Sequence, residues 1–141
     1  MNFTEVPNAD LFDKARWWVP YAEKVARREG CEVEFFVSSA LAGVDRIFVI
    51  WGDDGVPTGA VATRLHTRND TTRVGEIYWL AGHRLSSWLH LIPEIEQVLV
   101  RDYGIVEMEA TCRRGFERAT KPIGYRRAKV ILVKRLENGI R

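Results

Sequence analysis

The first third of the chain repeats its hydrophobic positions with a helical period. Five residues share one helical face: Leu11, Phe12, Ala15, Trp18 and Val19. Pro20 should end or kink this helix, since proline lacks the amide hydrogen, and the pattern then continues over Tyr21–Glu29 until Gly30. The sequence also predicts a short extended segment over Asn2–Val6 and a second helix over Glu32–Ala42.

After Arg46 the hydrophobic positions follow the pattern of strands. Arg46–Trp51 is an apolar run rich in β-branched and aromatic residues, and Gly59–Thr67 resumes after the turn-forming cluster Asp53–Pro57. The two runs are therefore predicted to form a hairpin. Val74–Leu80 is predicted to be the next strand.

A longer helical pattern follows this strand. Seven apolar residues recur at helical spacing: Trp88, Leu91, Ile92, Ile95, Val98, Leu99 and Tyr103. They predict an amphipathic helix over Ser86–Tyr103, capped by Ser86 or Ser87 and ended by Gly104. Pro93 allows an alternative, because proline is common in the first turn of a helix that starts later.

The last part of the chain continues the alternation of strands and helices. Ile105–Cys112 is predicted to be a strand, Gly115–Ile123 a short helix and Arg126–Leu136 a closing strand. A strand, a long helix and another strand imply a crossover connection and a parallel pair, whereas the earlier hairpins imply antiparallel neighbours. We therefore expect one α/β (α+β) domain over residues 1–141 with a mixed sheet.

This order of elements resembles the GCN5-related N-acetyltransferase (GNAT) fold over nearly the whole chain. The closing run Arg114–Tyr125 resembles the family's pattern of a short helix that leads into a glycine and an aromatic residue. Ile77–Gly82, followed by a helix that bears a tryptophan, is most like small GNAT-like proteins of tailed bacteriophages. The resemblance implies a mostly antiparallel sheet with a central parallel pair and helices on both faces.

The resemblance also implies a cofactor, acetyl-CoA, whose pyrophosphate the family binds with backbone N–H groups after the fourth strand. The corresponding residues here are His83, Arg84, Leu85, Ser86 and Ser87. Glycines normally let the backbone approach the phosphates, and this run has none, so binding should be weakened. The alternative interpretation is that the serine pair is an ordinary helix cap.

The residues expected to carry acetyl transfer are only partly present. Where this chain has Arg113 and Thr120, the family commonly has an Asn and a Tyr. The hydroxyl of that Tyr acts as the general acid that protonates the leaving thiolate. Glu76 is the candidate general base, and Tyr78 and Tyr125 are the candidate acids. The alternatives are that Glu76 faces solvent and that both tyrosines pack in the core.

Charge is distributed unevenly along the chain. Residues 113–141 hold ten Lys and Arg against two Glu, whereas the whole chain has a net charge of only +2. A basic C-terminal third suits an anionic partner, such as a phosphorylated cofactor, a nucleic acid or an acidic protein. The alternative is a solvated basic face.

The cysteines and histidines of the chain do not predict disulfides or a metal site. Two cysteines make neither a disulfide framework nor a structural zinc site, and His66, His83 and His90 lack the spacing of metal ligands. We therefore expect no metal. There is no run of about 20 apolar residues and no secretory signal, so no membrane partner is expected.

Two functions follow from these observations. The first is an acyl-CoA-dependent N-acetyltransferase with an eroded cofactor loop and active site. The second is a non-catalytic protein on the same scaffold that binds a virion or host protein. Both place the protein in the cytoplasm of a host cell, and the second also places it in a virion.

Overall fold

The computed structural model describes residues 1–111, 114–128, 132–134 and 136. The chain divides into two compact units, Met1–Thr111 and Cys112–Arg141, which are described separately below. The single domain expected over residues 1–141 therefore stays a prediction.

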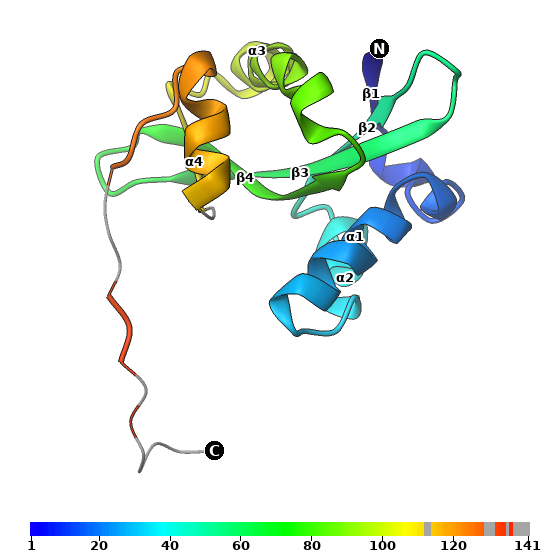
Figure 1. The fold of residues 1–141 in the computed structure, drawn as a ribbon. Coiled ribbons are helices and arrows are strands. Elements are labelled where there is room, and N and C mark those ends of the chain that lie inside the picture. Colours follow the sequence, from blue (N-terminus) through cyan, green and yellow to red (C-terminus); the bar gives the residue numbers. More distant parts are fainter. Residues whose placement is uncertain (112–113, 129–131, 135, 137–141) are drawn as a thin grey trace. The chain divides into compact units, whose positions relative to one another are not determined.

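The first unit contains a mixed five-stranded sheet with the order β1-β2-β3-β4-β5 (Figure 1). The strands are β1 (Asn2–Val6), β2 (Arg46–Trp51), β3 (Pro57–Thr67), β4 (Arg73–Gly82) and β5 (Glu107–Ala110). The first three pairs are antiparallel and β4–β5 is parallel. The predicted fold class is confirmed, although the parallel pair lies at the edge of the described sheet instead of its centre.

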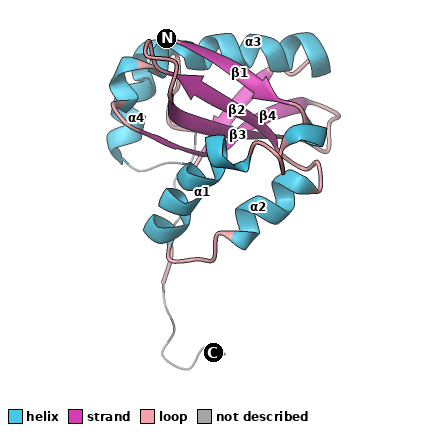
Figure 2. Cartoon of the chain, turned by 90° about the vertical axis from the view of Figure 1, so that its right-hand side faces the viewer, coloured by secondary structure: helices cyan, strands magenta, loops and turns pink. Residues whose placement is uncertain are grey.

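Helices cover both faces of this sheet (Figure 2). On one face lie α1 (Ala15–Glu29) and α2 (Glu34–Leu41), and on the other lies α3 (Ile92–Tyr103). The apolar side chains of α1 and α2 form one core with those of β2, β3 and β4. None of the helices in the described residues is long and apolar enough to cross a membrane.

Helix α1 runs through Pro20, so of the two predicted effects of this residue, an end or a kink, the end does not occur. The neighbouring residues Trp18, Tyr21 and Ala22 are buried against the sheet. Their burial holds the helix together although proline cannot donate the backbone hydrogen bond. Gly30 ends the helix in the left-handed conformation, as predicted.

Helix α3 begins at Ile92, six residues later than the start predicted at Ser86. Two short 3-10 turns, Leu85–Ser87 and Leu89–Leu91, precede it. The hydroxyl of Ser87 donates to the Arg84 carbonyl at 2.6 Å and caps no helix. Pro93 lies in the first turn of α3, where its missing amide hydrogen costs nothing, so the alternative start is confirmed.

The second unit contains helix α4 (Arg114–Thr120) and a 3-10 turn, Lys121–Ile123. A closing strand was predicted over Arg126–Leu136. The residues of this range that the structure describes, 126–128, 132–134 and 136, are not in a strand, and the others lie outside the description.

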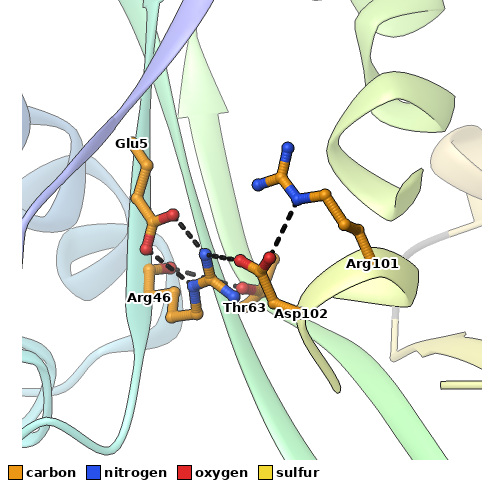
Figure 3. Close-up of polar contacts among 5 residues, drawn as sticks. All are labelled: Glu5, Arg46, Thr63, Arg101 and Asp102. Atoms are coloured by element: carbon orange, nitrogen blue, oxygen red, sulfur yellow. Dashed lines mark hydrogen bonds and ion pairs between the residues drawn. The ribbon is translucent and has the colours of Figure 1, made fainter. Parts of the chain in front are cut away.

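A half-buried arginine ties two strands to α3 (Figure 3). Arg46 of β2 donates from Nε to Glu5 of β1 at 2.6 Å and from Nη2 to Asp102 of α3 at 2.8 Å. Its guanidinium also lies 4.9 Å from the ring of Tyr103. The hydrogen bond to Glu5 raises the pKa of Arg46, burial lowers it by less, and Asp102 adds to the rise.

Two glycines and one tryptophan determine how β4 ends. Gly59 and Gly82 are cross-strand partners, and the indole of Trp88 packs directly on them. A Cβ on Gly82 would lie 2.6 Å from the Thr58 carbonyl oxygen and 3.0 Å from the indole. Trp88 is fully buried, and its Nε1 donates to the His83 carbonyl at 3.1 Å. Only glycine fits at the end of this strand.

We predict that Gly82→Ala destabilises the protein, because the added methyl group meets backbone atoms that cannot rotate away. The expected loss is about 1–3 kcal/mol, seen as a fall in Tm of about 3 °C or more in thermal unfolding. Ser86→Ala, a change at an exposed position of the following loop, is the matched control and should leave Tm nearly unchanged. Equal Tm values for Gly82→Ala and the wild type would contradict the packing of Trp88.

A second prediction concerns Asp102, whose pKa is lowered by hydrogen bonds from Arg101 and Arg46. A carboxylate with a lowered folded-state pKa stabilises the fold above its unfolded pKa of about 3.9 and loses this effect as pH falls through the folded value. Asp102→Asn should therefore lower Tm at pH 7, with the difference shrinking below about pH 4. Asp13→Asn, at an exposed position, should show no such difference. A constant Tm difference at all pH values would exclude the charge as the cause.

Candidate functional site

The residues predicted to bind the cofactor form one short loop after β4. His83, Arg84, Ser86 and Ser87 are exposed, and Leu85 is half-buried. Arg84 has φ 50° and ψ 51°, which is the left-handed conformation. This conformation costs a residue other than glycine roughly 1–2 kcal/mol. Strained backbone of this kind is concentrated at binding sites, so the conformation of Arg84 points to a functional loop.

Three successive backbone N–H groups of this loop, those of Arg84, Leu85 and Ser86, donate to no acceptor in the described part of the chain. The groups on either side are occupied: the His83 N–H donates to the Thr58 carbonyl, and the Ser87 N–H donates to the Arg84 carbonyl, both at 2.8 Å. Successive free N–H groups around a left-handed residue form a concave site for an anion. The loop can therefore hold a phosphate without any glycine.

The pairing of β4 with β3 shifts register a few residues before this loop, at a β-bulge. Ala62 of β3 pairs with Trp79 and Thr63 pairs with Ile77, so Tyr78 is an extra residue in β4. The parallel partner β5 pairs only as far as Ile77. Among the described residues, the segment 78–82 thus has a strand on one side only, and its other edge can accept an extended ligand.

Tyr78, one candidate acid, lies against a charged pair. The guanidinium of Arg64 lies 3.4 Å from the centre of its ring, and the ring of Phe36 packs at 5.8 Å. Arg64 in turn donates to the buried carboxylate of Asp45 at 2.6 Å. Burial lowers the pKa of Arg64, but the hydrogen bond and charge of Asp45 raise it by more. This pair holds a permanent positive charge at the face of the tyrosine.

Glu76, the candidate base, lies on the same strand and is 29% exposed. It pairs in register with Arg64 of β3 on one side and with Glu109 of β5 on the other. Its Oε2 is 3.9 Å from Nδ1 of His66. The structure thus brings Glu76 and Tyr78 together beside Arg64, but in a charged group that sequence reasoning missed.

The missed residues had only weak signals in the sequence. Arg64 and His66 are polar residues at alternating positions of a predicted strand, and Asp45 precedes another strand. Which of them would face Glu76 or Tyr78 depends on the strand register, including the extra residue at Tyr78. The pattern of one strand does not contain that information.

The remaining candidate positions lie in the second unit. Thr120 occupies the position where the GNAT resemblance implies a tyrosine as general acid. Its side chain is buried, and its hydroxyl donates to the Phe116 carbonyl at 2.7 Å. This hydroxyl is therefore engaged with its own helix. Tyr125 is half-buried, and Arg113 lies outside the described residues.

Comparison by sequence finds no family model that matches the chain and no match among curated proteins. Comparison by structure finds many acetyltransferases. A probable acetyltransferase superimposes with a TM-score of 0.70 at 15% identity over 100% of both chains. Ribosomal-protein-alanine N-acetyltransferase from Brucella melitensis biovar Abortus 2308 superimposes with a TM-score of 0.66 at 14% identity, covering 96% of this chain and 100% of that one.

A third similar structure is a predicted acetyltransferase from Clostridium acetobutylicum, crystallised with acetyl-CoA. It superimposes with a TM-score of 0.63 at 13% identity over 95% of each chain. Identities this low establish a shared architecture and leave the chemistry to the residues of the site. The chain therefore has the GNAT fold of these acetyltransferases.

Proposed function

We propose that this protein binds acetyl-CoA and transfers the acetyl group to a primary amine. The observation that carries the proposal is the set of three free N–H groups at Arg84, Leu85 and Ser86, in a fold shared with acetyltransferases. The cofactor supplies an activated acyl thioester. The protein's own residues would hold its phosphates, orient the acyl group and move protons.

The loop suits the pyrophosphate of the cofactor in both geometry and charge. The three N–H groups would donate to phosphate oxygens, as the backbone does in other anion sites. Arg84 is exposed and makes no ion pair within the described residues, so its guanidinium is available as a counter-charge. The hydrogen bond of Trp88 to the His83 carbonyl and that of the Ser87 N–H to the Arg84 carbonyl would hold the loop in this strained conformation before the ligand arrives.

The unpaired edge of β4 would bind the amide-containing arm of the cofactor. An extended ligand can hydrogen-bond to such an edge as an additional strand does. The segment 78–82 leads directly to the loop, so a ligand held by the N–H groups would extend along it toward Tyr78.

The chemistry would then rest on Glu76 and Tyr78. Glu76 would accept a proton from the ammonium group of the acceptor, which makes the amine nucleophilic. Tyr78 would donate its phenolic proton to the departing thiolate, and the positive charge of Arg64 favours the negative charge left on the oxygen. Tyr125 is the alternative acid.

A second function is favoured by one specific observation. Thr120 stands where active family members have a tyrosine that acts as general acid. Its hydroxyl donates to the backbone of its own helix. A protein with the same fold that binds a virion or host protein needs no such acid. The resemblance to bacteriophage proteins and the basic C-terminal third agree with this binding role, and nucleic acid is a further anionic partner for the same charges.

The cofactor loop is tested by Arg84→Glu, which reverses the charge closest to the free N–H groups. We expect the Kd for acetyl-CoA in calorimetric titration to rise by more than about tenfold, and more at low salt than at high salt. Arg27→Glu makes the same charge change at an exposed position of α1 and should leave affinity unchanged. Equal affinity of Arg84→Glu and wild type would place the ligand elsewhere.

The chemistry is tested by Glu76→Gln and Tyr78→Phe, each of which removes one functional group and keeps the shape. If Glu76 is the base and Tyr78 the acid, each change should lower kcat for a small primary amine by about a hundredfold, with little change in cofactor affinity. Tyr125→Phe tests the alternative acid in the same assay, and a loss of kcat in that variant with none in Tyr78→Phe would assign the role to Tyr125. A wild-type rate in Glu76→Gln would exclude Glu76 as the base.

Cofactor binding without measurable acetyl transfer by the wild type would support the binding function instead. In that case the protein would bind the cofactor at the loop without catalysing acetyl transfer. Absence of both cofactor binding and turnover would overturn the proposed enzyme.

A further inference from the structure

Three side chains with metal-ligating atoms meet on neighbouring strands of the sheet. They are His66 of β3, Glu76 of β4 and Glu109 of β5, and one ligand atom from each lies within 4.8 Å of the other two. Glu76 and Glu109 are register partners in the parallel pair. His66 lies two residues beyond Arg64, the β3 partner of Glu76, and therefore on the same face.

The distances place these groups close together without hydrogen bonds between them. Nδ1 of His66 is 3.9 Å from Oε2 of Glu76, and Nε2 of His66 is 3.7 Å from Oε2 of Glu109. Zinc ligands lie about 2.0–2.2 Å from the metal, so two ligand atoms of one ion are roughly 3–3.5 Å apart. The two distances involve different imidazole nitrogens, and only one of these can bind a given ion. With one ligand atom taken from each residue, the three atoms lie within 4.8 Å of one another, so rotations of the side chains would have to bring them to the separation that zinc needs.

The charge in this group favours a cation. Carboxylates opposite one another on neighbouring strands repel. Arg68 pairs with Oε1 of Glu109 and, at 2.8 Å, with Glu107, which leaves Oε2 of Glu109 directed to His66. Within the described residues no Lys or Arg forms an ion pair with Glu76, whose cross-strand partner Arg64 is hydrogen-bonded to Asp45 and acts on Glu76 only through its charge. A divalent cation would remove the repulsion between Glu76 and Glu109.

We propose that His66, Glu76 and Glu109 bind a divalent transition-metal ion of the Zn²⁺ class. One neutral imidazole nitrogen and two carboxylate oxygens would be the ligands, and a water molecule or small ligand would complete a four-coordinate site. The imidazole distinguishes this set from an ordinary acidic surface, since nitrogen ligands favour Zn²⁺ and its neighbours over Mg²⁺ and Ca²⁺. The proposal departs from the expectation of no metal, which rested on the spacing of the histidines along the sequence.

The site shares Glu76 with the proposed acetyl transfer. A bound ion would occupy the carboxylate and prevent it from accepting a proton, so Zn²⁺ should inhibit turnover. This consequence rests on the proposed function, whereas metal binding does not. Titration of the full chain with Zn²⁺ in the absence of acetyl-CoA therefore tests the site independently.

The experiment is calorimetric titration of the full chain with Zn²⁺, together with the visible absorption of bound Co²⁺. We expect one ion per chain with a Kd of about 10 µM or tighter, and a four-coordinate Co²⁺ spectrum. His66→Ala and Glu109→Gln should each weaken binding at least about tenfold. Circular dichroism shows whether the variants fold, and His66→Gln replaces His66→Ala if that variant does not.

Glu107→Gln is the matched control. It removes the same charge from the same strand and also touches Arg68, but Glu107 is not a ligand. Its Kd should change by less than about threefold. The proposal is overturned if Zn²⁺ does not bind saturably with one ion per chain, or if Glu107→Gln weakens binding as much as His66→Ala, which would indicate diffuse charge attraction.

Discussion

The packing of Trp88 on Gly59 and Gly82 is the contact on which the candidate site depends. The indole closes the end of the β3–β4 ladder and is anchored by its hydrogen bond to the His83 carbonyl. The chain between the glycine and the tryptophan must therefore turn within five residues. It does so by placing Arg84 in the left-handed conformation, and the N–H groups of Arg84, Leu85 and Ser86 then have no acceptor among the described residues. A buried apolar contact thus determines the conformation of the candidate loop.

Strand β4 connects this loop to every other part of the site in the first unit. Its first half pairs with strands on both sides, and its second half has a described partner on one side only. The extra residue at Tyr78 lies at the boundary between the two halves. Bulges of this kind redirect side chains and are common beside active sites. The open edge, the candidate acid and the candidate base are therefore consequences of how one strand is paired.

The fold favours acetyl transfer, whereas the residue at one candidate catalytic position does not. The architecture superimposes on acetyltransferases over nearly the whole chain. The side chain at Thr120, by contrast, is hydrogen-bonded within its helix. Packing constrains an architecture at many positions, whereas catalysis constrains a few, so the two can diverge.

The sequence by itself determined the elements whose causes are local. The bounds of β1 and β2, the glycines that end α1 and α3, and the parallel pair around α3 follow from periodicity, left-handed glycines and the crossover rule. The resemblance carried by the order of elements and by the closing run Arg114–Tyr125 supplied the fold and the candidate residues.

Only the tertiary structure decided which side chains meet. The continuation of α1 through Pro20 depends on burial against the sheet. The contacts of Tyr78 with Arg64 and of Glu76 with His66 depend on strand register between residues more than ten positions apart. Register results from the pairing of whole strands and the extra residue in β4, and no local pattern records it.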